Sequence, residues 1–600
     1  MRVGVFFCQF NPEWSLALDP VIKYADNLPG VVLTRQMGIK PKPEPESLAE
    51  LIRTYDFERV VIAGDSPGYF KPLFTKAVAM SDLNTEEIRL ASFREHGAEG
   101  ADAIDRAKAI LACAVFGVPY SLAAVPKGGP VHHATLVIGG GIAGIQAALE
   151  LANAGKQVYL VERTGTIGGH MAMFDKTFPT LDCAACILTP KMVAVAQHDM
   201  IRLFTGSTVE YVNGVPGAYR ARIKTRPRYV DLKACVSCGI CSEVCPVKVA
   251  SEFDAGISQR KAIYIPFPQA IPNVYIIDGD HCTYLQTAGT KCGVCEKKCP
   301  KECINFQDKG QVTDIEIGNI ILATGYDILD PTIIPQYGYG VFPNVITALE
   351  FERLTNASGT TGGRIVVKTK KTSKRTGEEE WIFDAGNPPP KNVAIIHCVG
   401  SRNKKYNAYC SRVCCMYSLK FSHLVKEKIP GANCYEFYID MRAFGKGYEE
   451  FAERIREEGT FVVRGRSATV SMNGDQLVVK GEDIVQDKNV EFPVDLVILA
   501  VGLVPARGTA ELCKLLGLKR DSDGWFSELD YNGNPTETER GGIFVAGMCQ
   551  GPKDIPDTVA QASAVAAGVL RSISSGRGIG HRSSLMLSEI EARAKSIHTY

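Results

Sequence analysis

The sequence predicts an α/β protein built from several domains, and three observations lead to this fold class. Strand and helix patterns alternate from the first residue to about residue 128. A new strand then runs into a glycine-rich turn, a helix and a second strand between residues 134 and 162. Nine cysteines lie between residues 235 and 303, inside the region that continues this second α/β pattern. Alternation of this kind favours parallel sheets covered by helices.

Composition limits the class of protein. A chain of 600 residues is long enough for about four domains. Its 67 basic and 66 acidic residues nearly cancel, so no charge pattern indicates nucleic acid or an anionic membrane as a partner. Met1 begins directly with the strand-like run R-V-G-V-F-F, and no window holds eighteen consecutive apolar residues. We therefore expect no secretory signal, no transmembrane segment and a cytoplasmic location, where twenty cysteines suit redox centres.

The N-terminal region reads as a small doubly wound α/β domain. Short buried strands are expected at Val3–Phe7, Val31–Thr34, Arg59–Ala63 and Ile88–Ala91. Helices are expected around 17–27, 46–54, 70–80 and 101–116. The run P-K-G-G-P at Pro126–Pro130 predicts a linker to the next domain.

A dinucleotide-binding fingerprint follows the linker. The predicted strand Ala134–Ile138 leads into G-x-G-x-x-G, and a predicted helix, Ile145–Ala154, comes next. A second strand, Val158–Val161, ends at an acid. The fingerprint residues are Gly139, Gly141, Gly144 and Glu162. Glycines at this spacing let the backbone and a helix N-terminus approach a pyrophosphate, and the acid can accept a hydrogen bond from a ribose hydroxyl.

The fingerprint alone allows NAD or FAD, and three further features favour FAD. Gly168 and Gly169 follow the acid closely, as in flavoproteins of the two-dinucleotide-fold type. The run I-L-A-T-G-Y at Ile321–Tyr326, with Thr324 and Gly325, resembles the crossing strand of those proteins. The run G-I-F-V-A-G ending at Gly547 resembles their late flavin-contacting strand, before a predicted helix Thr558–Leu570. Met548 stands where those proteins usually carry an acid.

The cysteine-rich stretch matches the C-x2-C-x2-C-x3-C-P run of bacterial ferredoxins. Three closely spaced thiolates hold one [4Fe–4S] cluster, and the cysteine before the proline binds the other cluster of the pair. We assign the first cluster to Cys235, Cys238, Cys241 and Cys299. We assign the second cluster to Cys282, Cys292, Cys295 and Cys245, which leaves Cys303 unassigned. A structural zinc site is the main alternative, but it leaves most of these thiols unused. Clusters with a purely structural role are a further alternative.

A second dinucleotide domain is expected after a flexible segment, Asn356–Gly377, that is rich in Gly, Ser, Thr and Lys. Its first strand, Asn392–His397, runs into C-V-G-S-R and not into a glycine fingerprint. A set of four cysteines takes that place: Cys398, Cys410, Cys414 and Cys415. We interpret the set as ligands of a third [4Fe–4S] cluster, and buried cysteines that pack as small hydrophobes are the alternative.

Cys183 and Cys186 follow the glycine pair of the first domain. Flavin disulfide reductases keep a redox-active cysteine pair in this general region. A dithiol that faces the flavin, a pair of cluster ligands and structural cysteines all remain open.

Four motifs in order resemble the A-type subunit family of the heterodisulfide reductases, over about residues 131–575. They are D-C-A-A-C-I-L-T-P-K-M at 182–192, the inserted ferredoxin, C-V-G-S-R with Y-C-S-R-V-C-C-M-Y, and G-M-C-Q-G-P-K-D at 547–554. The resemblance implies an iron–sulfur flavoprotein, with FAD in a thioredoxin-reductase-like fold and a cluster at the Cys398 set. It also implies a flavin that splits electron pairs, that is, electron bifurcation.

The resemblance implies partners and further site residues. Members of the family exchange electrons with ferredoxin, with a hydrogenase or dehydrogenase module and with disulfide-reducing subunits, and we expect a homodimeric core. Lys420 is a candidate for contacting the reactive edge of the flavin, where a cation stabilises the anionic reduced form. An exposed helix lysine is the alternative. Lys553, in the last motif, is a candidate cofactor contact.

Two departures from the family pattern matter. Asp65 and Gly97 stand where the family's N-terminal domain has cysteines, so we expect no cluster there. The chain reaches Tyr600 without the C-terminal ferredoxin domain of the methanogen proteins, so we expect one electron exit to be missing or supplied by a partner. The resulting hypothesis is an electron-transfer subunit containing FAD and [4Fe–4S] clusters. A stand-alone flavin disulfide oxidoreductase that uses Cys183 and Cys186 is the alternative.

The predicted organisation has seven segments. They are an N-terminal α/β domain (1–130), the first part of the FAD-binding domain (131–227), the ferredoxin insert (228–310), the crossing strand of the FAD-binding domain (311–345), the degenerate second dinucleotide domain (346–505), the last part of the FAD-binding domain (506–575) and a polar tail (576–600).

Overall fold

The computed structural model describes residues 2–574, except 10, 12, 13, 15, 39–42, 82, 118–130, 373–376 and 378. The chain divides into two compact units, of which residues 2–117 and 131–574 are described. The predicted linker at 126–130 and the predicted tail at 576–600 fall outside the described residues. Within the described ranges, no helix has both the length and the apolar character needed to cross a membrane.

The first unit is a four-stranded parallel sheet in the order β2-β1-β3-β4. Its strands are β1 (Val3–Cys8), β2 (Val31–Met37), β3 (Arg59–Gly64) and β4 (Ile88–Ser92). Its helices are α1 (Asp19–Asp26), α2 (Pro45–Thr54), α3 (Lys71–Ala79) and α4 (Ala103–Phe116). Phe7 packs against the layer of α1 and α4, whereas Phe6 points to the layer of α2 and α3. Helices therefore cover both faces, and the predicted doubly wound pattern is confirmed.

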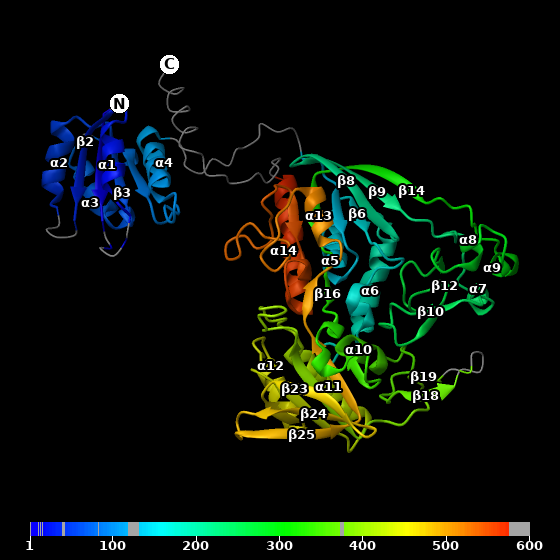
Figure 1. The fold of residues 1–600 in the computed structure, drawn as a ribbon. Helices are drawn as coiled ribbons and strands as arrows, with labels where there is room; N and C mark the ends of the chain where they lie inside the picture. The colour runs from blue at the N-terminus through cyan, green and yellow to red at the C-terminus, as the bar shows by residue number, and fades with distance from the viewer. Residues whose placement is uncertain are drawn as a thin grey trace. The chain divides into compact units, whose positions relative to one another are not determined.

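The second unit begins with a five-stranded parallel sheet in the order β28-β15-β5-β6-β7. Its strands are β5 (Thr135–Ile138), β6 (Val158–Val161), β7 (Ile201–Phe204), β15 (Asn319–Leu322) and β28 (Ile543–Val545). Helices α5 (Ile142–Asn153), α6 (Ala184–Gln197) and α14 (Ile555–Ser574) pack on one face, with α5 beside α14 (Figure 1). Strands separated by hundreds of residues thus form one sheet.

An antiparallel layer covers the other face of this sheet and carries the cysteine-rich insert. The layer consists of β8 (Ser207–Val215), β9 (Ala218–Thr225) and β14 (Gln311–Ile317), in the order β14-β9-β8. Thr225, the last residue of β9, pairs with Gln311, the first residue of β14. The insert between them therefore leaves and re-enters the layer through neighbouring strand ends. It contains the short helices α7 (Ile240–Glu243), α8 (Thr283–Gln286) and α9 (Val294–Lys298).

A second five-stranded parallel sheet follows, in the order β17-β26-β20-β21-β22. Its strands are β17 (Val345–Thr347), β20 (Asn392–Val399), β21 (Asn433–Tyr438), β22 (Phe461–Arg464) and β26 (Leu496–Val501). Helices α10 (Ala348–Thr355) and α11 (Cys414–Lys428) cover one face. The antiparallel strands β23 (Ser467–Asn473), β24 (Gln476–Asp483) and β25 (Lys488–Val494) cover the other. Two such sheets in one unit are the predicted two-dinucleotide-fold architecture.

The structure corrects two local predictions. The segment Asn356–Gly377 is not wholly a flexible excursion, because Ile365 and Val366 are buried in the core beside α10 and α11. It continues into a hairpin of β18 (Thr369–Thr372) and β19 (Glu379–Ile382). The predicted crossing strand Ile321–Tyr326 ends early, since β15 stops at Leu322 and Gly325 has a φ of +69°. The backbone turns there toward a cavity.

Candidate functional site

A cavity of about 900 Å³ lies at the carboxyl ends of the strands of the first sheet. The glycine-rich turn after β5, the acid after β6 and the turn after β15 all line it. The carboxyl edge of a parallel sheet is the usual place for a dinucleotide. Residues of α10, α11 and the cysteine-rich insert complete the walls, so the two sheet domains and the insert all contribute to the cavity.

Glycines allow close backbone approaches around this turn. A side chain at Gly139 would place its Cβ 2.3 Å from the carbonyl oxygen of Ala323, and Gly139 has a φ of +111°. A Cβ at Gly144 would lie 1.9 Å from the carbonyl oxygen of Gly139. Gly144 therefore lets α5 start against the turn, while Gly139 and Gly141 line the cavity. This is the arrangement that the fingerprint predicts.

Glu162 occupies the predicted acid position at the end of β6. One carboxylate oxygen accepts a hydrogen bond from the backbone N–H of Gly140 at 2.7 Å. The other accepts from the N–H of Thr164 at 2.8 Å. These bonds hold the carboxylate at the cavity wall, where it can meet a ribose hydroxyl.

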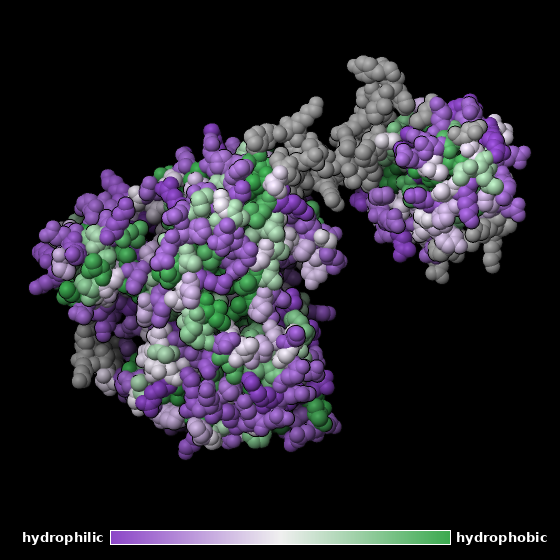
Figure 2. Space-filling view, turned by 180° about the vertical axis from the view of Figure 1, so that it is seen from behind, coloured by the Kyte–Doolittle hydropathy of each residue, from purple (hydrophilic) through white to green (hydrophobic). Residues whose placement is uncertain are grey.

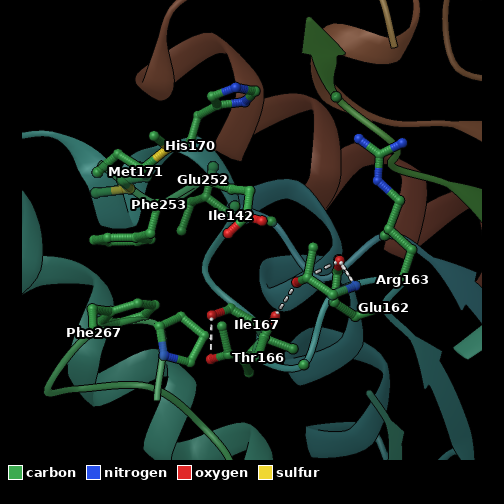
Figure 3. Close-up of a pocket in the computed structure, with 18 of the residues that line it drawn as sticks. Ile142, Glu162, Arg163, Thr166, Ile167, His170, Met171, Glu252, Phe253 and Phe267 are labelled. Atoms are coloured by element: carbon green, nitrogen blue, oxygen red, sulfur yellow. Dashed lines mark hydrogen bonds between the residues drawn. The ribbon is translucent and has the colours of Figure 1, made fainter. Parts of the chain in front are cut away.

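The insert contributes an aromatic wall that the sequence did not indicate. Figure 3 shows Phe253 and Phe267 near the same cavity as Ile142 and Glu162. The two phenylalanine rings stack with centroids 4.5 Å apart. The cysteine-rich insert and the glycine-rich turn therefore line one cavity.

His170 and Tyr326 form a stacked pair on another wall, with ring centroids 4.3 Å apart. Burial lowers the pKa of His170 to about 4, and Arg163 adds to this effect while Asp327 opposes it. Burial also raises the pKa of Tyr326 above its ordinary range. Both rings are therefore neutral near pH 7, and the pair presents an uncharged, flat surface to the cavity.

Lys420 lies on α11 and is buried, with 2% of its surface exposed. The alternative of an exposed helix lysine is therefore wrong. Its ammonium group donates to the carboxylate of Glu352 on α10 and to the carbonyl oxygen of Lys176 at 2.9 Å. Burial raises the pKa of Glu352, although Lys420 opposes this shift. Both side chains line the cavity. No sequence motif had indicated Glu352 as a residue of this site.

Lys553 and Thr324 close the cavity near the last strand. Lys553 donates to the carbonyl oxygen of Gly547 at 2.8 Å, and burial lowers its pKa to about 8. The hydroxyl of Thr324 is buried and has no hydrogen-bond partner among the described residues. A polar group at the cavity wall that is left without a partner fits a ligand that supplies one.

The predicted cofactor residues fall into two groups. Seven of them line the cavity: Gly139, Gly141, Glu162, Gly169, Thr324, Gly325 and Lys553. The other three lie behind the cavity wall, where glycine permits close packing: Gly144, Gly168 and Gly547. A Cβ at Gly547, for example, would lie 2.8 Å from the Cβ of Ala143. Met548 lines the cavity in place of the usual acid. The size of the cavity, its close backbone turn and the unpaired hydroxyl of Thr324 fit FAD.

The insert contains two small cavities ringed by cysteines. Four thiols surround one of them: Cys245, Cys282, Cys292 and Cys295. Five surround the other: Cys235, Cys238, Cys241, Cys299 and Cys303. Each cavity is lined by the cysteines of one predicted set, and Cys303 lines the first as well, while the ligand sets themselves stay a prediction. Among the described residues, no three His, Cys, Asp or Glu side chains converge closely enough to hold a single metal ion. Rings of thiols around a void fit clusters.

The third cysteine set lies between β20 and α11. Cys398, at the end of β20, packs with Cys414 and Cys415, the first residues of α11. Cys410 is half-buried in the preceding loop, and Arg402 lies near both Cys398 and Cys410. The buried Nη1 of Arg402 has no hydrogen-bond partner among the residues that the structure describes. A donor without a partner beside four thiols fits a cluster that supplies acceptors.

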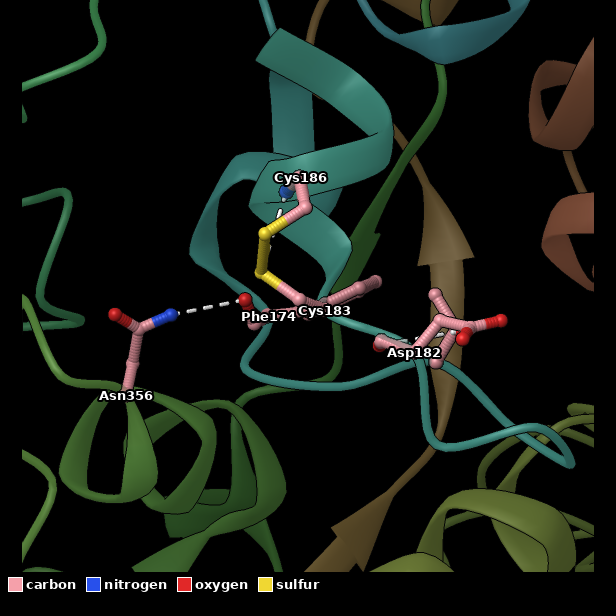
Figure 4. The surroundings of a disulfide bond; sticks show 6 residues. Phe174, Asp182, Cys183, Cys186 and Asn356 are labelled. Carbon is pink, nitrogen blue, oxygen red and sulfur yellow. Dashed lines mark hydrogen bonds between the residues drawn. A yellow bond between two sulfur atoms is a disulfide. The ribbon is translucent and has the colours of Figure 1, made fainter.

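Cys183 and Cys186 form a disulfide at the start of α6 (Figure 4). Both residues are exposed, and neither lines the cavity. The backbone at Cys183 pairs with Lys176, whose carbonyl oxygen accepts from Lys420. The pair therefore lies near the cavity wall but outside it, and its role stays a hypothesis.

Comparison with protein families gives two matches. A family of FAD-dependent oxidoreductases matches residues 135–177, and a 4Fe-4S binding domain matches residues 228–250. Together with the cavity and the cysteine rings, these matches define an oxidoreductase that carries FAD and [4Fe–4S] clusters.

The particular family follows from curated relatives. The A-type subunit of the H(2):CoB-CoM heterodisulfide,ferredoxin reductase of Methanothermobacter marburgensis is 41% identical over 94% of this chain and 84% of its own length. The A-type iron-sulfur subunit of the CoB–CoM heterodisulfide reductase of Methanocaldococcus jannaschii is 41% identical over 95% of this chain and 85% of its own. The A-type subunit of the Ferredoxin:CoB-CoM heterodisulfide reductase of Methanosarcina mazei is 36% identical over 96% and 71%. The chain belongs to the A-type subunit family of the heterodisulfide reductases, as the sequence motifs predicted.

Solved structures are more distant. The thioredoxin reductase of Lactococcus lactis is 13% identical, and the comparison covers 74% of this chain and 99% of that one with a TM-score of 0.39. The predicted cofactors, FAD and [4Fe–4S] clusters, are confirmed by the family matches, while the number of clusters stays a prediction.

Proposed function

We propose that this chain is the electron-transfer subunit of a heterodisulfide-reductase-like complex, with three [4Fe–4S] clusters and a flavin site at which electron pairs are divided. When bound, FAD exchanges electron pairs and single electrons, and the clusters accept single electrons. The protein supplies the positions, the hydrogen bonds and the charges around these groups.

A single observation supports the proposal most strongly: one cavity is lined both by the glycine-rich turn and by the cysteine-rich insert. Phe253 belongs to the insert and Gly139 to the turn, so the insert is part of the flavin site itself. An insert whose clusters served only to hold it together would not need to form a wall of this cavity.

The two cysteine rings supply the ligand sets. We assign Cys245, Cys282, Cys292 and Cys295 to one cluster, since these four surround one void. Cys235, Cys238, Cys241 and Cys299 hold the other. The set of Cys398, Cys410, Cys414 and Cys415 holds the third, at the place where a nicotinamide dinucleotide would bind in an intact second domain.

Lys420 and Glu352 control charge at the cavity wall. The ammonium group of Lys420 is held by Glu352 and by the carbonyl oxygen of Lys176, so its position is fixed before any ligand arrives. A fixed cation next to a reduced flavin stabilises negative charge there.

The insert also offers a surface for a protein partner. Cys238 and Cys292 are exposed, and Leu232, Val236 and Val294 expose between 39% and 58% of their surface nearby in sequence. Figure 2 shows apolar surface over the insert, at the left of that view. Small apolar patches beside an exposed redox centre suit transient docking of an electron carrier.

The relatives' names extend this proposal to substrates. They act on a CoB–CoM heterodisulfide with hydrogen or ferredoxin as the other reactant. We propose that this chain exchanges electrons with a ferredoxin or with a hydrogenase or dehydrogenase module, and with disulfide-reducing subunits. We also propose a homodimeric core and a cytoplasmic location for the complex.

A stepwise reduction of the purified protein tests the proposal. Optical spectra follow the flavin and EPR follows the clusters while a low-potential reductant is added. The proposal expects flavin and cluster signals to change together, and no steady turnover of a nicotinamide cofactor by the isolated chain. Clusters that never become reduced while the flavin does would overturn it.

A second function is favoured by one observation only, the disulfide between Cys183 and Cys186. A stand-alone flavin disulfide oxidoreductase would use this pair. Because the two cysteines are exposed and lie outside the cavity, the electron-transfer proposal is favoured over this alternative.

A further inference from the structure

Cys303 is the thiol that neither the ferredoxin pattern nor the proposed ligand sets use. It is buried, and it lines the same small cavity as Cys235, Cys238, Cys241 and Cys299. A [4Fe–4S] cube takes four protein thiolates. The first cluster site therefore contains one thiol more than it needs, whereas the second contains four.

The surplus thiol has two of the proposed ligands as hydrogen-bonding neighbours, Cys299 and Cys235. The sulfur of Cys303 lies 3.4 Å from the sulfur of Cys299, within the range of an S–H···S hydrogen bond. The two residues are four positions apart, and the N–H of Glu302 donates to the carbonyl oxygen of Cys299 in the turn between them. This turn brings both sulfurs to the same side of the cavity.

The backbone fixes Cys303 independently of Cys299. Its carbonyl oxygen accepts from the N–H of Asp231 at 2.8 Å, and the next residue, Ile304, forms a bridge with Val230. The N–H of Cys235 in turn donates to the carbonyl oxygen of Asp231. Cys303 is thus tied to the segment that starts the first cluster motif, and it would stay at the site if Cys299 were removed.

We propose that Cys303 is a reserve ligand of the first cluster, which donates a hydrogen bond to Cys299 and can replace it on the iron. In the replacement, the Cys303 thiol would give up its proton and form an iron–sulfur bond, while the Cys299–iron bond breaks and the Cys299 thiolate takes up a proton, so that four thiolates remain and no electron is gained or lost. In a chain without the Cys299 thiol, no bond breaks and the proton of Cys303 passes to solvent. While Cys299 is the ligand, the Cys303 thiol acts on it through a hydrogen bond, which raises the potential of a cluster. This inference rests on the proposed ligand sets.

Iron and acid-labile sulfide per chain, together with the EPR spectrum of the reduced protein, test the inference in four variants. Cys299→Ala should keep the iron of all clusters, because Cys303 takes over. Cys299→Ala combined with Cys303→Ala should lose the iron of one cluster. Cys245→Ala is the matched control, since no surplus thiol lines its cavity, and it should lose one cluster by itself.

Cys303→Ala completes the set and does not depend on ligand replacement. It should keep every cluster and shift the midpoint potential of one cluster to a more negative value, because a hydrogen bond is lost. If Cys299→Ala loses as much iron as Cys245→Ala, or if Cys303→Ala alone loses a cluster, the inference is overturned. If Cys245→Ala keeps all its iron, the ligand sets themselves are wrong, which is a separate outcome.

Discussion

Lys420 on α11 and Glu352 on α10 form a buried ion pair in the wall of the flavin cavity, although the two residues are 68 positions apart. Each side chain is nearly inaccessible to solvent. The backbone N–H of Asp175 also donates to Glu352, at 3.1 Å, so the carboxylate joins three segments of the chain. The pair therefore couples the second sheet to the flavin domain at the cavity wall.

Replacing Lys420 with methionine should destabilise the second unit, by about 3–5 kcal/mol, because the carboxylate of Glu352 is left buried without its cation. Burial already raises the pKa of Glu352, so its folded state holds the proton more tightly than the unfolded state. Stability contributed by such a group falls as pH rises through the raised pKa. The free energy of unfolding that Lys420→Met loses should thus be larger at pH about 8 than at pH about 5.

Urea unfolding at the two pH values measures this difference. The double variant Lys420→Met with Glu352→Gln is the control, since it removes both charges and should recover most of the stability at the higher pH. A loss that is the same at both pH values would contradict a buried, unpaired carboxylate.

Replacing Gly139 with alanine should abolish tight FAD binding. The new Cβ would lie 2.3 Å from the carbonyl oxygen of Ala323, and the residue needs a left-handed φ of +111°. Gly155→Ala is a matched control, because Gly155 also has a positive φ, of +72°, but its Cβ would meet nothing. The control should lose about 1–2 kcal/mol of stability and keep its flavin. Flavin absorbance per chain after gel filtration compares the two variants. An equal loss of flavin in both would contradict the need for glycine at position 139 in the flavin site.

The sequence predicted this turn well because its signal is local. Gly139, Gly141, Gly144 and Glu162 lie within one strand–turn–helix–strand unit, so spacing alone specifies their geometry. Glu352 and Phe253 reach the same cavity from elements that are far away in the sequence, and no pattern in one chain pairs such elements. The burial of Lys420 was equally hidden, because a lysine on a helix is usually exposed. Cys303 was left unassigned because the ferredoxin spacing has no place for it.

Lys553 should make FAD binding depend on pH. Burial lowers the pKa of Lys553 to about 8, so its ammonium group loses its charge as pH rises through that value. Below pH 8 the charge attracts an anionic pyrophosphate, and above it the attraction fades. The affinity of FAD-depleted protein, measured by fluorescence quenching of added FAD, should therefore fall across this range. Lys553→Met should bind more weakly at low pH and show a flatter profile, and an unchanged slope would exclude Lys553 as the titrating group.

The disulfide of Cys183 and Cys186 should react with an external dithiol without disturbing the flavin. Both cysteines are exposed at the start of α6 and lie outside the cavity. After mild reduction, thiol titration should detect two more free thiols per chain, those of this pair, while the flavin absorbance stays unchanged. The variant with Cys183→Ser and Cys186→Ser should lose that gain and keep its FAD and iron. A new long-wavelength flavin band on reduction of the wild-type pair would instead support the flavin disulfide oxidoreductase.

We propose that one chain holds a flavin and three clusters, with the third cluster at the Cys398 set. Quantification of iron, acid-labile sulfide and flavin in the anaerobically purified chain tests it most directly. We predict one FAD and about twelve iron atoms per chain, four for each cube, and a loss of about four of them in a Cys398→Ala variant that keeps its flavin. A wild-type chain with FAD but with only about eight iron atoms, unchanged by Cys398→Ala, would contradict the claim.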